Sequence, residues 1–279
     1  MRWLRIWFVV LCTTFNGLVW PYVAMAQQAL GPVTVQGGPW MLAGRAYSTA
    51  HLSPHPHLVL VLHGDAPFVN PGYQYAFAQA AAGSLDDAIV VGLLRPGYKD
   101  DMSGESQGAR GWTTGDNYTA ERISSIVAAA RTLMARYHTS DLTLVGHSGG
   151  ATIAADIVAL YPHLARGVLL VSCPCDVPAF RWSMFEFQWN PLWLWPVGSI
   201  SPQSHVNEIP PDTIVRLVVG SDDPIALPRL TKSFAAALKQ HGGNVAVKVE
   251  TGKGHEILLE PEVLNQLKPL MAAKWHPRQ

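Results

Sequence analysis

Charged residues are scarce in this chain. Aspartate, glutamate, lysine and arginine make up 14% of its 279 residues, and the 20 basic side chains balance the 20 acidic ones. A chain without net charge has no basic field to attract a phosphate backbone, so nucleic-acid binding is not expected. Repeats and low-complexity segments are lacking too. The sequence is instead rich in apolar residues, at 48%, which is ample material for one core.

Cysteine is rare, with three in the whole chain. Cys12 belongs to the N-terminal segment, which leaves Cys173 and Cys175 on either side of Pro174. In an oxidising compartment such a pair can close a small disulfide ring. Two free thiols are the alternative, because so short a ring strains the bridge geometry. Two sulfurs without a nearby histidine do not complete a tetrahedral site, so no metal is expected.

The chain also lacks a long, uninterrupted hydrophobic run. Its N-terminus has a positively charged start, an apolar stretch and the small residues Ala24-Met25-Ala26, which together predict a secretory signal peptide over residues 1–26. Polar residues interrupt the apolar stretch, so it is a poor membrane span. We therefore predict a secreted or periplasmic protein, with one α/β domain over residues 27–279 and no membrane span in the mature chain.

Apolar runs alternate with helical segments along the mature chain. Runs typical of strands buried on both faces occur at residues 58–64, 88–94, 142–145 and 167–172. Helices are predicted over residues 73–82, 119–137, 151–161, 230–240 and 261–274, and further strands over residues 213–220 and 245–250. This alternation indicates a parallel sheet. An antiparallel pair, residues 32–36 and 40–47, is predicted to precede it.

An aromatic segment interrupts this alternation after Cys173. We interpret residues 174–211, which are rich in tryptophan, phenylalanine and proline, as a small cap. Trp182, Trp189 and Trp193 are predicted to offer a substrate apolar or ring-stacking surface. The alternative for any one of these rings is that it packs the cap onto the body.

The run Gly146-His147-Ser148-Gly149-Gly150 joins an apolar strand to an alanine-rich helix. A serine on such a sharp turn is a nucleophile elbow, with its hydroxyl raised above the sheet edge and a helix N-terminus behind it. The pattern G-x-S-x-G occurs a second time around Ser106, but polar, turn-rich residues precede that serine. We therefore predict Ser148 as the nucleophile and Ser106 as part of a loop.

A serine hydroxyl is a poor nucleophile unless a base takes its proton, so a histidine and a carboxylate are expected further along. His255 and Asp223 each follow a predicted buried strand, at the strand ends where open α/β sheets place their sites. Asp223 precedes the turn-forming Pro224 and is preferred to Asp222 as the partner of His255. Asp176 is the fallback.

Two backbone amides are expected to stabilise the negative charge that develops on a substrate oxygen. Gly149, just after the nucleophile, supplies one. The amide of Asp65, in the turn after the first buried strand, supplies the other. His147, whose side chain should point away from that of Ser148, is placed among the substrate contacts.

These motifs, together with Arg95-Pro96-Gly97-Tyr98, resemble the α/β-hydrolase superfamily over essentially the whole mature sequence. The resemblance implies a mostly parallel eight-stranded sheet flanked by helices, with a short cap after the sixth strand. It also implies Ser-Asp-His catalysis without a cofactor. One departure is the run Lys99-Asp100-Asp101, where many members have a glycine and a serine, so the loop is longer here.

Three functions follow as hypotheses. The first is an exported serine hydrolase that cleaves small-molecule carboxylic esters. The second is a prolyl-type aminopeptidase, in which Glu186, Asp65 or Glu105 would hold a free amino terminus; the cap is short and carries little negative charge, so it ranks lower. The third is a binding protein that keeps this fold without chemistry, and the intact nucleophile, base and acid positions count against it.

Overall fold

A computed structural model describes residues 27–272, so the predicted signal peptide over residues 1–26 lies outside the described part of the chain. The strands are β1 (Gln28–Gly37), β2 (Trp40–Ser48), β3 (His57–Leu62), β4 (Ala88–Leu93), β5 (Leu142–His147), β6 (Gly167–Val171), β7 (Ile214–Gly220) and β8 (Asn244–Glu250). The α-helices are α1 (Tyr73–Ala82), α2 (Ala120–Arg136), α3 (Gly149–Leu160), α4 (Val177–Gln188), α5 (Pro228–Gln240) and α6 (Pro261–Ala272). No helix between residues 27 and 272 has both the length and the apolarity to cross a bilayer.

All eight strands belong to one mixed sheet, in the order β1-β2-β4-β3-β5-β6-β7-β8. β1 pairs antiparallel with β2, and β2 pairs antiparallel with β4. Every neighbouring pair from β4 to β8 is parallel. The prediction of a mostly parallel eight-stranded sheet that opens with an antiparallel pair is confirmed.

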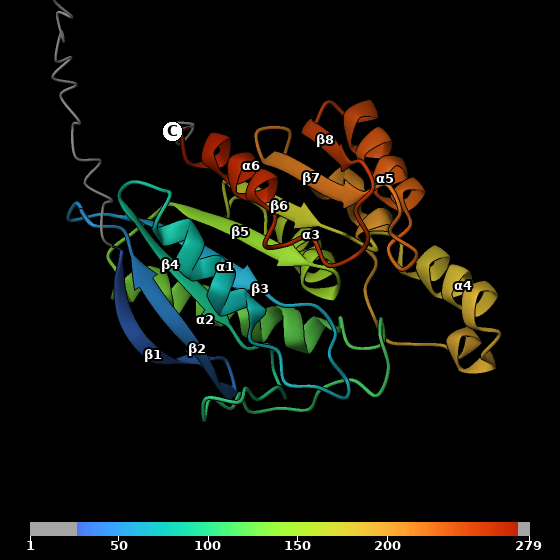
Figure 1. Ribbon diagram of the computed structural model, residues 1–279, viewed down its shortest axis with the longest axis horizontal. Helices are drawn as coiled ribbons and strands as arrows, with labels where there is room; N and C mark the ends of the chain where they lie inside the picture. The colour runs from blue at the N-terminus through green and yellow to red at the C-terminus, as the bar shows by residue number, and fades with distance from the viewer. Residues whose placement is uncertain (1–26, 273–279) are drawn as a thin grey trace, which may run out of the picture.

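Helices cover both faces of the sheet (Figure 1). α1 and α6 pack on one face around Phe77 and Leu267. α2, α3 and α5 pack on the other around Ile126, Ile157 and Phe234. β3 lies between these layers, and its apolar residues are all fully buried, which explains why the strand reads as one continuous apolar run.

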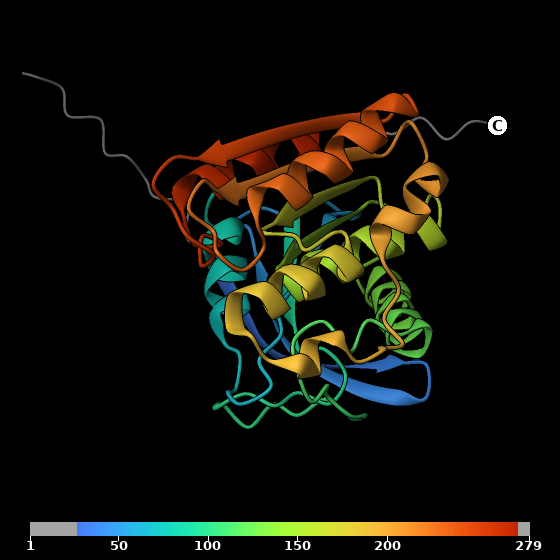
Figure 2. The same ribbon diagram turned by 90° about the vertical axis from the view of Figure 1, so that its right-hand side faces the viewer.

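The cap begins after β6, as the sequence predicts. α4 stands off the end of the sheet toward which the arrowheads of β5 and β7 point (Figure 1), and Figure 2 views the molecule from that side. Two 3-10 helices follow, η1 (Pro191–Leu194) and η2 (Pro202–Glu208). η2 packs back against α3, so the cap rests on the helix that leaves the elbow.

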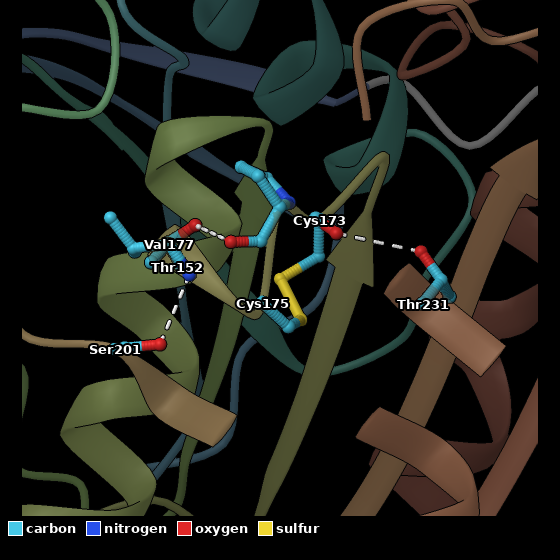
Figure 3. The surroundings of a disulfide bond; sticks show 7 residues. Thr152, Cys173, Cys175, Val177, Ser201 and Thr231 are labelled. Atoms are coloured by element: carbon cyan, nitrogen blue, oxygen red, sulfur yellow. Dashed lines mark hydrogen bonds between the residues drawn. A yellow bond between two sulfur atoms is a disulfide. The ribbon is translucent and has the colours of Figure 1, made fainter. Parts of the chain in front are cut away.

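A disulfide joins Cys173 to Cys175 at the root of the cap (Figure 3), which settles the alternative left open by the sequence. Both cysteines are fully buried. The hydroxyl of Thr231, on α5, donates to the Cys173 carbonyl over 3.5 Å. The amide of Val177, at the start of α4, donates to the Ser201 hydroxyl over 3.0 Å. The end of β6 is thus held to α5, and the start of α4 is held to the returning chain.

Asp156, on α3, is a fully buried carboxyl group whose two oxygens have no hydrogen-bond partner among residues 27–272. Burial raises the pKa of Asp156 to about 8, against about 4 in an unfolded chain. The folded protein then holds a proton that the unfolded chain releases, so stability should fall as the pH rises from about 4 to about 8.

Urea unfolding at pH 5 and pH 8 tests this stability effect. The free energy of unfolding should be roughly 3 kcal/mol lower at pH 8, and Asp156→Asn should remove most of that difference. Asp212→Asn, at an exposed position, is the control and should keep it. An Asp156→Asn protein with the pH dependence of the parent would contradict the assignment.

Candidate active site

Ser148 forms the turn between β5 and α3, with φ 52° and ψ −121°. This conformation is strained for a residue that has a side chain. A Cβ atom at Gly146 would lie 2.3 Å from the Gly150 carbonyl oxygen, and one at Gly150 would lie 2.4 Å from the His63 carbonyl oxygen. Glycine is therefore required where strand and helix pass closest, and the elbow has the geometry that its sequence predicts.

Ser106, the other serine in a G-x-S-x-G pattern, lies in a loop and is buried. Its hydroxyl accepts the Ala43 amide over 2.9 Å and donates to the Leu94 carbonyl over 2.8 Å. Both hydrogen-bonding functions serve the backbone, so this serine ties a long loop to the sheet.

His255 and Asp223 form a buried pair. The Nδ1 atom of His255 lies 2.9 and 3.0 Å from the two carboxylate oxygens of Asp223. Oδ1 of Asp223 also accepts the amides of Ile225 and Ala226, each over 2.9 Å, which fixes the carboxylate. With the Nδ1 proton directed at Asp223, the unprotonated Nε2 atom of His255 is left to accept a proton.

The other two candidate carboxylates bond elsewhere. Asp222 is exposed and accepts from the Ser221 hydroxyl. Asp176 caps the N-terminus of α4 by accepting the Ala179 amide over 3.1 Å. Of the three acids that were candidates to orient the catalytic histidine, only Asp223 contacts His255.

Ser148 and His255 line one cavity of about 310 Å³, at the edge of the sheet where the parallel strands end. Ala66, Val69 and Ile225 give it apolar walls, and further lining residues are Asp65, Tyr73, Thr114 and Glu256. The cavity thus brings together the elbow, the loop after β3 and the loop after β8, which are far apart in the sequence.

The loop after β3 is held by a buried ionic cluster that the sequence did not reveal. The Asp65 carboxylate accepts Arg95 over 2.9 Å, the Tyr118 hydroxyl over 2.5 Å and the Gly115 amide over 2.8 Å. Burial lowers the pKa of Arg95, but the charge of Asp65 and two neighbouring phenols outweigh burial and raise it. Arg95 therefore keeps its charge, and its ion pair with Asp65 helps to hold the loop after β3 in place.

This loop meets the residue after the nucleophile. A Cβ atom at Gly149 would lie 2.6 Å from Oδ1 of Asp65, so the two predicted oxyanion residues are in close contact. Within residues 27–272, neither the Asp65 amide nor the Gly149 amide donates a hydrogen bond to another protein group. Two unpaired N–H groups beside a nucleophile suit an anionic oxygen. Their role in an oxyanion hole stays a prediction.

A hydrogen-bonded chain links the same loop to the base. The Gly64 amide donates to the Tyr73 hydroxyl over 2.5 Å, which donates to Nδ1 of His147 over 2.9 Å. Nε2 of His147 donates to the His255 carbonyl over 3.1 Å. Burial, followed by the charge of His255, lowers the pKa of His147 to about 4, so the ring is neutral. Both of its nitrogens bond to protein groups, so it acts as a positioning residue. It also lines the Ser148 cavity, and its role as a substrate contact stays a prediction.

The three tryptophans predicted as substrate contacts do not line the Ser148 cavity. Trp182 and Trp193 line a separate cavity of about 550 Å³ within the cap. Trp189 lines neither cavity, and its side chain is 79% exposed. The sequence could place these rings in a cap but could not show which way they face.

The acidic groups proposed for a peptidase also lie away from the nucleophile or are already bonded. Glu186 accepts the Trp182 indole N–H over 2.9 Å, Glu105 lies on the loop that pairs with Lys99, and Asp65 is paired with Arg95. Glu256, which the sequence did not single out, lines the Ser148 cavity with a side chain that is 76% exposed.

His147, His255 and Glu256 place possible metal-ligating atoms within 4.8 Å of one another. Both ring nitrogens of His147 and the Nδ1 atom of His255 are already bonded to protein groups. We therefore assign no metal to these residues.

Sequence comparison finds a known family that is similar to part of the chain. The family described as serine aminopeptidase, S33, matches residues 103–218, a stretch that includes the elbow and the cap. A search of curated proteins found no match.

Comparison with solved structures covers nearly all of the chain. An esterase from Pyrococcus furiosus is 15% identical with a TM-score of 0.64, over 88% of this chain and 91% of that one. A protein from Thermus thermophilus is 20% identical with a TM-score of 0.66, over 90% and 100%. An acylaminoacyl peptidase from Pyrococcus horikoshii is 12% identical with a TM-score of 0.67, over 93% of this chain and 43% of the peptidase.

At these identities the solved structures establish only the fold. The family match is a separate sequence similarity, and it covers the region that contains the elbow. The matched residues 103–218 include the elbow and the cap after β6. The chain therefore has the α/β-hydrolase fold.

Proposed function

We propose that this protein is a carboxylic ester hydrolase with Ser148 as nucleophile, His255 as base and Asp223 as the acid that orients it. The observation that carries the proposal is one cavity that contains both the strained Ser148 and the imidazole of His255, whose Nδ1 is bonded to Asp223.

In the first half of the reaction, Oγ of Ser148 attacks the ester carbonyl carbon while its proton passes to Nε2 of His255. The amides of Asp65 and Gly149 hold the resulting oxyanion. The C–O bond then breaks, and the leaving alcohol takes the proton from His255. In the second half, water gives a proton to His255 and attacks the acyl-enzyme, which releases the acid and restores Ser148.

Ester cleavage is favoured over peptide cleavage by the charges around Ser148. A free amino terminus needs a carboxylate, and Asp65 is already paired with Arg95. A specific observation keeps an aminopeptidase as the second candidate: the exposed carboxylate of Glu256 lies in the cavity, and the family match is to serine aminopeptidases. A neutral ester needs no such partner.

Activity measurements separate these functions. Purified protein should cleave p-nitrophenyl esters and should leave aminoacyl p-nitroanilides intact. A wider screen of esters, graded by acyl length and with aryl and polyester members, would then define the substrate class. It should also react with a fluorophosphonate probe at Ser148. The reverse substrate preference would favour the peptidase, and a folded protein that neither turns over esters nor takes up the probe would be a binding protein.

Export is part of the proposal. The predicted signal peptide motivates it, and the Cys173–Cys175 disulfide supports it because such bonds persist in oxidising compartments. Cell fractionation of a tagged chain should recover a shortened protein outside the cytoplasm. Full-length protein confined to the cytoplasm would contradict this part.

A further inference from the structure

The cap contains a cavity of about 550 Å³ that has no lining residue in common with the Ser148 cavity. α4 and η1 form one wall with the rings of Trp182 and Trp193, and the chain that returns toward η2 forms the other with Ser199, Ser204 and His205. A concave site with aromatic faces on one side and a few polar groups on the other has the composition of a small-molecule pocket.

The two tryptophans offer ring faces rather than hydrogen bonds. The indole N–H of Trp182 donates to Glu186 over 2.9 Å, and that of Trp193 donates to Gln188 over 2.8 Å. Trp182 is 54% exposed although it is large and apolar. A planar ring that covers it removes apolar area from water and gains stacking energy.

Arg181 places a positive charge in the same cavity. The residue is 6% exposed. Its guanidinium lies 5.4 Å from the centre of the Trp193 ring and donates to the Leu192 and Trp195 carbonyls over 3.0 and 3.3 Å. Burial lowers the pKa of Arg181, but an arginine still keeps its proton at neutral pH.

This charge has no direct ion-pair partner among the described residues. Among residues 27–272, no carboxylate lies within ion-pair distance of Arg181. The nearest carboxylate that acts on it, Asp116, lies beyond ion-pair distance. Its Oδ2 accepts the Trp112 and Thr113 amides, and its Oδ1 is buried without a hydrogen-bond partner. Buried charges in proteins are normally paired, because an isolated one loses its hydration. An anionic ligand would supply the missing partner.

We propose that the cap cavity binds a ring-bearing carboxylate, with the ring on Trp182 and the carboxylate directed at Arg181. Nη1 and Nη2 of Arg181 already donate to three backbone carbonyls, so a carboxylate would be attracted by the charge of the guanidinium and by its remaining N–H groups. The two cavities adjoin, because Nη1 of Arg181 donates to the carbonyl of Thr114 over 3.2 Å and Thr114 lines the Ser148 cavity. The cap site therefore lies beside the reacting centre, yet its occupancy requires no catalysis.

Isothermal titration of the intact protein with 2-naphthoate tests the proposal. Comparison ligands are 2-naphthalenemethanol, which keeps the ring without the charge, acetate, which keeps the charge without the ring, and glucuronate, which has a saturated ring. At least one of the two ring-bearing carboxylates should bind at least tenfold more tightly than the alcohol and acetate. Naphthoate and glucuronate together distinguish an aromatic ligand from a sugar acid.

Variants locate the bound ligand. Trp182→Ala should weaken its binding by roughly tenfold, whereas Trp189→Ala, on an exposed cap residue that lines neither cavity, should leave it unchanged. Arg181→Gln should remove the preference for the carboxylate over the alcohol, and Arg181→Lys should retain part of it. If Arg181→Gln does not fold, the two tryptophan variants decide.

Equal binding to parent and Trp182→Ala, equal affinity for the acid and the alcohol, or no binding of either ring-bearing carboxylate to folded protein would overturn the cap site. Each of these results leaves ester turnover at Ser148 unaffected, so the proposed function is tested separately.

Discussion

Ser148→Ala is expected to lower kcat/KM for p-nitrophenyl esters by about 10⁴-fold or more. The loss is large because the substitution removes the atom that forms the acyl-enzyme, while the base and the oxyanion amides remain. Ser148 occupies a positive-φ turn. Alanine, like serine, carries a Cβ atom, so it should adopt the same backbone conformation at no greater cost. The variant should therefore unfold at nearly the parent temperature, and steady-state kinetics with a thermal melt checks both statements.

The chain supplies its own control for this experiment. Ser106 sits in the same five-residue pattern, but its hydroxyl bonds to the backbone at Ala43 and Leu94. Ser106→Ala should cost on the order of 1–3 kcal/mol of stability and keep ester turnover within a few-fold of the parent. Parent-like turnover by Ser148→Ala, or equal losses in the two variants, would reject Ser148 as the nucleophile.

Asp223→Asn is expected to lower kcat by about 10³ to 10⁴-fold. The carboxylate accepts the Nδ1 proton of His255 and two backbone amides. An asparagine amide group turned toward the ring would donate to Nδ1 and move the ring proton to Nε2, where it blocks acceptance of the serine proton. Binding of substrate should change much less than turnover, so KM should stay within a few-fold.

The neighbouring acid provides the matched comparison. Asp222 is exposed, and its carboxylate bonds only to the Ser221 hydroxyl among the described groups, so Asp222→Asn should retain nearly full activity. Comparable losses in Asp222→Asn and Asp223→Asn would show that the local charge, rather than contact with His255, controls the rate.

Much of the fold could be predicted because its signals are local. A continuous apolar run indicates a strand buried on both faces, and β3 between β4 and β5 is such a strand. The close approach of α3 to β5 requires glycine at position 146, and its approach to the end of β3 requires glycine at position 150. Five residues are therefore enough to predict the elbow. Asp223 could be preferred to Asp222 because a proline follows it, and the structure places that side chain against His255.

The remainder depends on side chains that meet only after folding. Arg95 and Tyr118 converge on Asp65 from positions 30 and 53 residues away, and no spacing rule connects them. The direction of the cap tryptophans depends on how α4 and η1 pack, which places Trp182 and Trp193 in a cavity separate from Ser148 and leaves Trp189 exposed. The sequence could not decide whether the disulfide forms, because two cysteines on either side of a proline are compatible with both a small disulfide ring and two free thiols.

The main-chain oxygen of His255 ends the hydrogen-bonded chain from Tyr73 and also accepts the Ser172 hydroxyl at the end of β6. Any local opening that lifts the histidine away must therefore break contacts to the residue before Ser148 and to the neighbouring strand. Amide protons in these three segments should then exchange with solvent as one cooperative unit. Partial unfolding of these segments should therefore abolish catalytic activity in one step, without a partly active intermediate.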